Sequence, residues 1–290
     1  NVLESVNKDI SLRQLRLSTG KKVNNAADDV ASYITSRALQ SRNGALKAAL
    51  NAVGDANNVA NILMDSLDNI NSLISNIKDS TTTASSGALG TDEKVALAKA
   101  AFRMAQQVQT VADSTVFGGQ QLLDGKFKAN FVIGTNASYN LITLGINMYN
   151  DNKDFNIASH YFNVNANTET NFAGVTGLDL NSLNVVNSND LGIFTQDKIH
   201  ITIQSLAAAL NNVNKVASYL GGIVNRLNSQ ETLLNSQITN YNSAISRLED
   251  ADVAKEQLEL VKSQFLQQTS LISLSQANQN PNSFLQLIQS

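Results

Sequence analysis

Residues 203–248 read IQSLAAALNNVNKVASYLGGIVNRLNSQETLLNSQITNYNSAISRL, and this stretch decides the fold. Apolar residues recur at every third or fourth position, which is the spacing of one face of an α-helix. The predicted stripe consists of Ile203, Leu206, Leu210, Val213, Ala217, Leu220, Val224, Leu227, Glu231, Leu234, Ile238, Tyr241, Ile245 and Leu248. A continuous helix of this length would measure roughly 65 to 70 Å, which is too long for a compact domain.

A matching stripe in the N-terminal half predicts what covers the first one. It consists of Leu46, Ala49, Val53, Ala56, Ala60, Leu63, Leu67, Ile70, Ile74 and Ile77. Because an apolar helical face must be buried, each stripe is expected to cover the other. The sequence therefore predicts a mainly α fold, in which long N- and C-terminal helices form an antiparallel coiled-coil hairpin or bundle with a small β-rich central segment.

The chain divides into five predicted segments. We expect an N-terminal helix with a connector over residues 1–28, long helices over 29–116, a β-rich segment over 117–195, the long C-terminal helix over 196–248 and a last helix over 249–290. Turn and cap residues separate the helices, and the helical period is lost in the central segment.

Local signals predict the ends of two helices. The first long helix is expected to end near Asp79, before a loop of Ser, Thr and Gly residues over 80–87. The next helix is expected to begin with Thr91 as its N-cap, because acidic residues follow it in the first turn.

The central segment carries strand signals. The apolar runs 131–133 and 141–144 are separated by a Gly- and Asn-containing stretch and predict a β-hairpin. Residues 155–164 and 183–186 are predicted to form further strands.

Composition excludes several classes of protein. The 290 residues carry a net charge of −3 and give no basic surface for nucleic acid. The absence of cysteine excludes disulfides and thiolate chemistry. No apolar run reaches about 18 residues, so no membrane insertion is expected. The first residues lack the pattern of a secretory signal, so export would need a route that does not read one.

The sequence offers no catalytic, metal or cofactor site. His160 and His200 are the only histidines, and no cysteine or carboxylate cluster accompanies them. Glu249, Asp250 and Asp252 could hold a cation, but a helix start or a polar contact explains them better. No catalytic motif is present, so we expect a protein that is not an enzyme.

Short motifs at both ends resemble those of one protein family, bacterial flagellin. The motifs are LSTGKKVN at 17–24, AADD at 26–29, FGGQQLL at 117–123, LGGIVNRL at 220–227, SRLEDAD at 246–252 and QANQNP at 276–281. They are similar to family motifs and occur in the same order.

The resemblance implies a fold and a function. Flagellins are extracellular subunits that polymerise into the hollow filament used for swimming. They are exported unfolded through the flagellum's own type III apparatus. The implied partners are other copies of the subunit, an export chaperone on the C-terminal helix, and the filament cap and junction proteins. Two departures from the family are expected, namely a short central segment and a first helix without the family's opening residues.

The stripes and the last helix supply the candidate residues for helix packing and assembly. These are Leu63, Leu67, Ile70, Leu220, Leu227, Leu234, Leu248, Val253, Leu260, Phe265 and Leu271.

The resemblance also implies a site for the vertebrate innate receptor that senses flagellin. In agonist flagellins that site contains two arginines, an acid and two apolar residues near the end of the first long helix. Aligned through Leu67 and Ile70, this chain has lost the first arginine and the last leucine. The predicted weakened patch is Asn76, Lys78, Asp79 and Ser80.

Three alternatives stay open. A hook–filament junction protein shares the terminal helices, although its end lacks the 276–281 motif. A cell-surface flagellin relative could act as an adhesin or polysaccharide-binding protein, but only scattered aromatic residues in the central segment favour it. Periodicity alone also allows a generic coiled coil such as a phage fibre.

Overall fold

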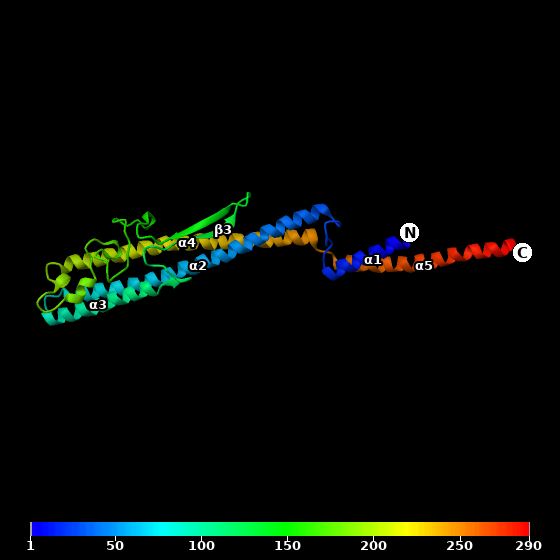
Figure 1. The fold of residues 1–290 in the computed structure, drawn as a ribbon. Coiled ribbons are helices and arrows are strands. Elements are labelled where there is room, and N and C mark those ends of the chain that lie inside the picture. Colours follow the sequence, from blue (N-terminus) through cyan, green and yellow to red (C-terminus); the bar gives the residue numbers. More distant parts are fainter. Residues whose placement is uncertain (1, 290) are drawn as a thin grey trace. The chain divides into compact units, whose positions relative to one another are not determined.

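The computed structural model describes the backbone of residues 2–289 and the side chains of residues 2–278. Five helices dominate it, namely α1 (Val2–Thr19), α2 (Val30–Ala84), α3 (Thr91–Ser114), α4 (Ile199–Glu249) and α5 (Val253–Gln289), as Figure 1 shows. The chain forms two compact units. We call residues 1–46 with 236–290 the terminal unit and residues 47–235 the central unit. The predicted mainly α fold with a small β-rich part is confirmed.

The central unit is built on an antiparallel pairing of α2 with α4. Asn57 on α2 pairs with Asn228 on α4, and Asn71 pairs with Asn214, so the two helices run in opposite directions. Every member of the predicted N-terminal stripe is buried. The apolar residues at every third or fourth position therefore form the buried face of α2 where it packs against α4.

The buried face of α4 is rotated from the predicted one. Leu206, Val213, Leu220, Leu227 and Leu234 belong to both versions and are buried. The intervening buried positions are Ala209, Val216 and Ile223, not the neighbouring Leu210, Ala217 and Val224. Glu231 is exposed, whereas the neighbouring Gln230 is half-buried. The predicted stripe was wrong at Leu210, Ala217, Val224 and Glu231, because adjacent apolar residues allow either face.

The loop predicted over residues 80–87 was wrong in its first half, because α2 continues to Ala84. The hydroxyls of Thr81, Thr82 and Thr83 donate to carbonyls one turn earlier at 2.8, 2.8 and 2.9 Å. Thr81 is also fully buried, and such back-bonding lets a hydroxyl residue remain inside a helix.

The N-cap of α3 is also one residue earlier than predicted. Gly90 occupies the cap position and offers no side-chain hydrogen bond, while Thr91 is the first helical residue. Asp92 and Glu93 lie in the first turn, where the helix dipole favours negative charge.

Two β-hairpins follow α3. Strands β1 (Val116–Phe117) and β2 (Gln120–Gln121) are joined by Gly118 and Gly119, whose φ angles of 58° and 80° suit a two-residue hairpin turn. Strands β3 (Lys128–Thr135) and β4 (Leu141–Asn147) pair antiparallel with an irregularity between Val132 and Gly134. This second hairpin confirms the prediction from the 131–133 and 141–144 runs.

The second hairpin is fastened to α4. Gln230 donates from Nε2 to the carbonyl oxygen of Ile133 at 2.6 Å. The Tyr219 hydroxyl accepts the Asn147 N–H at 3.1 Å. Figure 1 accordingly draws β3 alongside α4.

The strands predicted at 155–164 and 183–186 were wrong. The region contains only short 3-10 helices, η1 (Lys153–Phe155), η2 (Phe172–Gly174), η3 (Asn181–Val185) and η4 (Gly192–Phe194), joined by irregular chain. Its apolar side chains build a small core that includes Phe155, Phe162, Phe172, Leu180, Leu183 and Phe194. Gly174 has a φ of 75°, and a Cβ there would lie 2.3 Å from the Tyr161 carbonyl oxygen, so only glycine fits.

In the terminal unit, α1 lies antiparallel against the first part of α5. Arg13 of α1 contacts Glu256, whereas Asn7, nearer the start of α1, contacts Gln267. No side chain of α1 is buried. Its apolar residues Leu3, Val6, Ile10 and Leu17 are half-buried, so the helix keeps some apolar surface accessible.

Candidate assembly site on the terminal helices

The N- and C-terminal motifs meet at a polar junction within the terminal unit. The Lys22 N–H donates to the Glu249 carbonyl oxygen at 2.6 Å, and the Ala251 N–H donates to the Gly20 carbonyl oxygen at 2.9 Å. Gly20 has a φ of 70°, as is common just after a helix. The motifs 17–24 and 246–252 thus form one structural element.

Glu249 is the centre of this junction. Its side chain is almost fully buried and accepts hydrogen bonds from Lys21 Nζ and Gln40 Nε2, both at 2.6 Å. Burial alone would raise the pKa of Glu249, but hydrogen bonds from Lys21 and Ser36 and the charges of Lys21 and Arg37 together lower it. The carboxylate therefore stays ionised and links the end of α4 to Lys21 and to Gln40 of α2.

The two other acids of the cluster, Asp250 and Asp252, have structural roles. Asp252 accepts the Lys255 N–H at 3.1 Å and so caps α5. Asp250 forms an isolated β-bridge with Lys21. Among the residues whose side chains are described, no group of three or more His, Cys, Asp or Glu residues could hold a metal ion.

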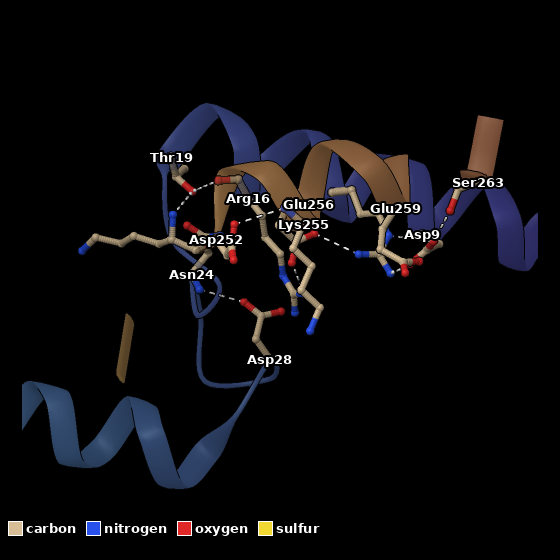
Figure 2. Close-up of polar contacts among 12 residues, drawn as sticks. Asp9, Arg16, Thr19, Asn24, Asp28, Asp252, Lys255, Glu256, Glu259 and Ser263 are labelled. Atoms are coloured by element: carbon tan, nitrogen blue, oxygen red, sulfur yellow. Dashed lines mark hydrogen bonds and ion pairs between the residues drawn. The ribbon is translucent and has the colours of Figure 1, made fainter. Parts of the chain in front are cut away.

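Two arginines of α1 are bound to acids of α5. Arg13 contacts Glu256 at 2.9 Å and Glu259 at 3.8 Å, and Arg16 reaches Glu256 at 3.3 Å. Figure 2 shows Arg16, Glu256 and Glu259 at this contact. Charge-assisted bonds of this kind fix orientation as well as distance.

Asp9 extends the network one turn further. It accepts from Arg13 Nε at 3.0 Å and from the Ser263 hydroxyl at 2.5 Å. The Ser263 hydrogen bond lowers the pKa of Asp9, burial opposes it, and Arg13 lowers the pKa further. The interface between α1 and α5 therefore contains a connected network of polar groups.

As a result, α5 turns its polar side inward. The side facing α1 carries Glu256, Ser263 and Gln267, with Leu260 as its buried apolar residue. The opposite side carries what we call the outer stripe, Leu258, Val261, Phe265 and Ile272, whose exposed fractions are 66%, 56%, 68% and 66%. With 3.6 residues per turn, these four side chains lie within about 60° of arc.

An open groove lies beside the start of α1. It has a volume of about 830 Å³ and is lined by Val2, Leu3, Asn7, Ser270 and Leu274, among others. Leu274 is 55% exposed, although it points to the same side of α5 as Ser263. The terminal helices thus present apolar surface on two sides.

The predicted packing and assembly residues fall into two groups. Leu63, Leu67, Ile70, Leu220, Leu227 and Leu234 are completely or almost completely buried inside the chain. Leu260 is buried against α1, and Leu248 is half-buried. Val253, Phe265 and Leu271 are exposed. Only this last group can meet another molecule without unfolding.

The sequence reasoning missed three members of the outer stripe, Leu258, Val261 and Ile272. Their spacing from Phe265 follows the helical period and could have been found by projecting α5 on a helical wheel. The predicted set mixed both sides of the helix, because Leu260 and Phe265 point in nearly opposite directions.

The predicted receptor patch lies within α2 and not at its end. Asn76 and Asp79 are exposed, whereas Lys78 and Ser80 are half-buried. Ile77 between them belongs to the buried stripe. The patch therefore presents two exposed side chains on a continuous helix.

In the described part of the chain, no helix is both long enough and apolar enough to cross a membrane.

Comparisons with known proteins agree with the motifs. Residues 1–128 match the bacterial flagellin N-terminal helical region, and residues 203–288 match the bacterial flagellin C-terminal helical region. Flagellin FlaB1 of Treponema pallidum (strain Nichols) is 25% identical over 273 residues, which cover 94% of this chain and 90% of that protein. Flagellin of Bacillus subtilis (strain 168) is 26% identical over 307 residues, and the match covers 99% of this chain and 95% of that protein.

A solved structure shares the fold. A putative flagellar hook-associated protein from Vibrio parahaemolyticus superimposes with a TM-score of 0.59 at 12% identity, over 77% of this chain and 100% of its own. The two family matches lie at the ends that form the terminal unit and the long helices. Because they cover most of the sequence between them, the chain belongs to the bacterial flagellin family and is a structural subunit of the flagellar filament.

Proposed function

We propose that the subunit polymerises through its terminal helices, with the outer stripe of α5 as a principal contact to neighbouring copies. The observation that carries this proposal is the inverted arrangement of α5, which satisfies its polar side against α1 and leaves its apolar side in water. Contiguous exposed apolar surface of this kind marks an interaction site.

Energetics favour a second copy of the chain as the occupant. Burying a side chain such as Leu, Val, Ile or Phe stabilises a complex by about 1.5 to 3 kcal/mol. The apolar residues of the outer stripe recur along α5, so one helix can contact neighbouring copies at several positions, as in a polymer. The arginine–glutamate contacts between α1 and α5 hold the stripe in a fixed orientation before assembly, which lowers the entropy lost on binding.

The outer stripe is also a suitable binding surface for an export chaperone. A helix with one apolar side fits a hydrophobic groove, so an export chaperone would cover the stripe of α5 until assembly. We propose export through the flagellar type III apparatus to the extracellular filament, where cap and junction proteins are further partners. We propose no enzymatic activity.

We also propose that the patch at Asn76, Lys78, Asp79 and Ser80 makes this flagellin a weak ligand of the vertebrate receptor. Asn76 stands where agonists have an arginine, and it cannot form a planar multi-donor contact with a carboxylate. Ser80 offers less apolar area than leucine.

Filament assembly of a stripe variant tests the main proposal. Phe265→Ser should abolish salt-induced polymerisation, measured by light scattering and electron microscopy, and leave the helical content of the monomer unchanged. Gln264→Ser is the matched control, because Gln264 is exposed beside the stripe. Filaments formed by Phe265→Ser at the rate of the parent chain would overturn the proposal.

The hook–filament junction alternative makes a different prediction in the same assay. A junction protein would add a short segment and stop, whereas a filament subunit elongates continuously. The adhesin alternative has little support in the central segment, because Phe155 and Phe162 are buried in its small core and Tyr161 is half-buried. Among the aromatic residues of 117–195, only Tyr139 and Tyr149 are exposed.

A further inference from the structure

We propose that the central unit contains a weak calcium site, located where the end of α3, the turn after β2 and the loop around Asn163 meet. The starting observation is a small polar cavity of about 80 Å³. Its polar lining residues are Gln109, Asp113, Gln121, Asp124, Asn163 and Asn165. Oxygen-bearing side chains therefore come together from three separate segments of the sequence.

One buried atom points to a missing ligand. Gln109 is only 9% exposed, and its Oε1 atom is buried without a hydrogen-bond donor. The orientation of this amide is fixed, because Nε2 donates to Asp113 Oδ1 at 2.8 Å. Leaving a buried acceptor without a partner destabilises the fold, so a cation or a water should bind it.

The charges around the cavity favour a cation, although the side chains of Asp113 and Asp124 are also exposed to solvent. Asp113 lies in the last turn of α3, where the helix end is already negative, and that turn contains no basic residue. Neither Asp113 nor Asp124 forms an ion pair with a described residue. A positive ion between them would offset both carboxylates and the helix end.

The donor set favours calcium. Asp124 Oδ1 accepts the Lys126 N–H at 2.9 Å, which leaves its second oxygen available, as the Gln109 bond does for Asp113. Hard oxygen ligands of mixed type suit Ca²⁺, which tolerates irregular geometry. The cavity has room for the ion with water beside it, since a single water needs only about 10 to 15 Å³ of such space.

The site would be weak and structural. Asn163 and Asn165 already accept backbone N–H groups through Oδ1, so they would contribute at most a second lone pair. Two carboxylates and one amide predict a dissociation constant on the order of 10⁻⁴ to 10⁻³ M, the range of extracellular calcium modules. Binding would tie the irregular segment 148–198 to α3. This inference concerns the monomer and does not depend on the assembly proposal.

Thermal melting of the monomer with calcium tests the site. In 10 mM CaCl₂ the melting temperature of the parent chain should rise by a few degrees relative to EDTA with NaCl at equal ionic strength. Asp124→Asn should abolish this rise. Asp68→Asn is the matched control, because it removes the same charge from an exposed position of α2 and should keep the full rise.

A second variant separates an ion site from a water site. Gln109→Glu places a third carboxylate at the cavity, so it should lower the melting temperature in EDTA and tighten calcium binding about tenfold, measured by titration calorimetry. If the buried Oε1 binds only water, the melting temperature of Gln109→Glu will be lower than that of the parent chain, and calcium will not raise it. That result, or an equal calcium effect in the parent chain and Asp124→Asn, overturns the proposal.

Discussion

Asn71 on α2 donates its side-chain amide to Asn214 on α4 at 3.1 Å, while its own Oδ1 is buried without a donor. Asn57 with Asn228, and Asn43 with Asn242 in the terminal unit, repeat the same one-sided bond. The pairs recur at every second heptad on both helices. Buried asparagines in coiled coils fix the register at a cost in stability, and we infer the same role here.

Replacing the donor asparagine should therefore stabilise the chain and loosen its register. Asn71→Leu removes the buried acceptor and should raise the free energy of unfolding by about 1 kcal/mol, measured by chemical denaturation. Distances between spin labels on α2 and α4 should become more broadly distributed. Asn58→Leu, on the exposed side of α2, should change neither quantity. A clear loss of stability in Asn71→Leu would contradict this role.

Leu220→Asp should unfold the pairing of α2 with α4. Leu220 is fully buried, and an unpaired carboxylate in such a place costs several kcal/mol. The melting temperature should fall by about 10 °C or more, measured by circular dichroism. Glu231→Leu serves as the contrast, because Glu231 is exposed and its replacement should leave the melting temperature nearly unchanged. Equal melting of Leu220→Asp and the parent chain would refute the buried face described here.

Deleting residues 249–290 should give a soluble monomer that cannot polymerise. The deletion removes the outer stripe and the Glu249 contacts to Lys21 and Gln40, but leaves the central unit intact. Sedimentation after addition of salt and filament seeds measures the result. Filaments built from the truncated chain would mean that α5 is dispensable.

Acid should melt the terminal unit. The pKa values of Asp9 and Glu249 lie below their ordinary values of 3.8 and 4.5. Each group therefore contributes stability that is fully present above its ordinary pKa and is lost as the pH falls through its lowered pKa. Helical content should be constant from neutral pH to about 4.5 and should fall below it. In Asp9→Asn with Glu249→Gln this acid-dependent loss should be smaller, with lower stability at neutral pH.

A reporter-cell titration tests the receptor patch. The parent flagellin should be about tenfold or more weaker than a strong agonist, because hot-spot contacts of arginine and apolar type are missing. Asn76→Arg combined with Ser80→Leu should recover potency. Ser80 is half-buried in a continuing helix, so the double variant also needs an unchanged melting temperature. Potency of the parent chain equal to that of a strong agonist would defeat the idea.

The sequence predicted α2 well and α4 only in part, for a physical reason. In α2 the stripe positions Ala56, Leu67, Ile70 and Ile77 have polar neighbours on both sides, which fixes the buried face of the continuous helix. In α4, Ala209 is followed by Leu210 and Ile223 by Val224, so the period allows two adjacent faces. The contacts with α2 decide between them, and a single helix does not contain that information.

The central segment could not be predicted from composition. Its aromatic and β-branched residues favour strands, but asparagine side chains accept nearby backbone N–H groups and turn the chain instead. Asn152, Asn163, Asn165 and Asn187 all form such bonds. The partners of Glu249 could not be predicted from the sequence either, because Lys21 lies 228 residues away along the chain.

The lack of any buried side chain in α1 has a thermodynamic consequence. Such a helix gains less stability from its own chain than a fully buried one, so contacts with neighbouring molecules should add to its stability. By mass action, the melting temperature of α1 and α5 should then rise with subunit concentration, whereas that of the central unit should not. The arrangement of α1 and α5 should therefore be less stable in a dilute subunit than in a filament.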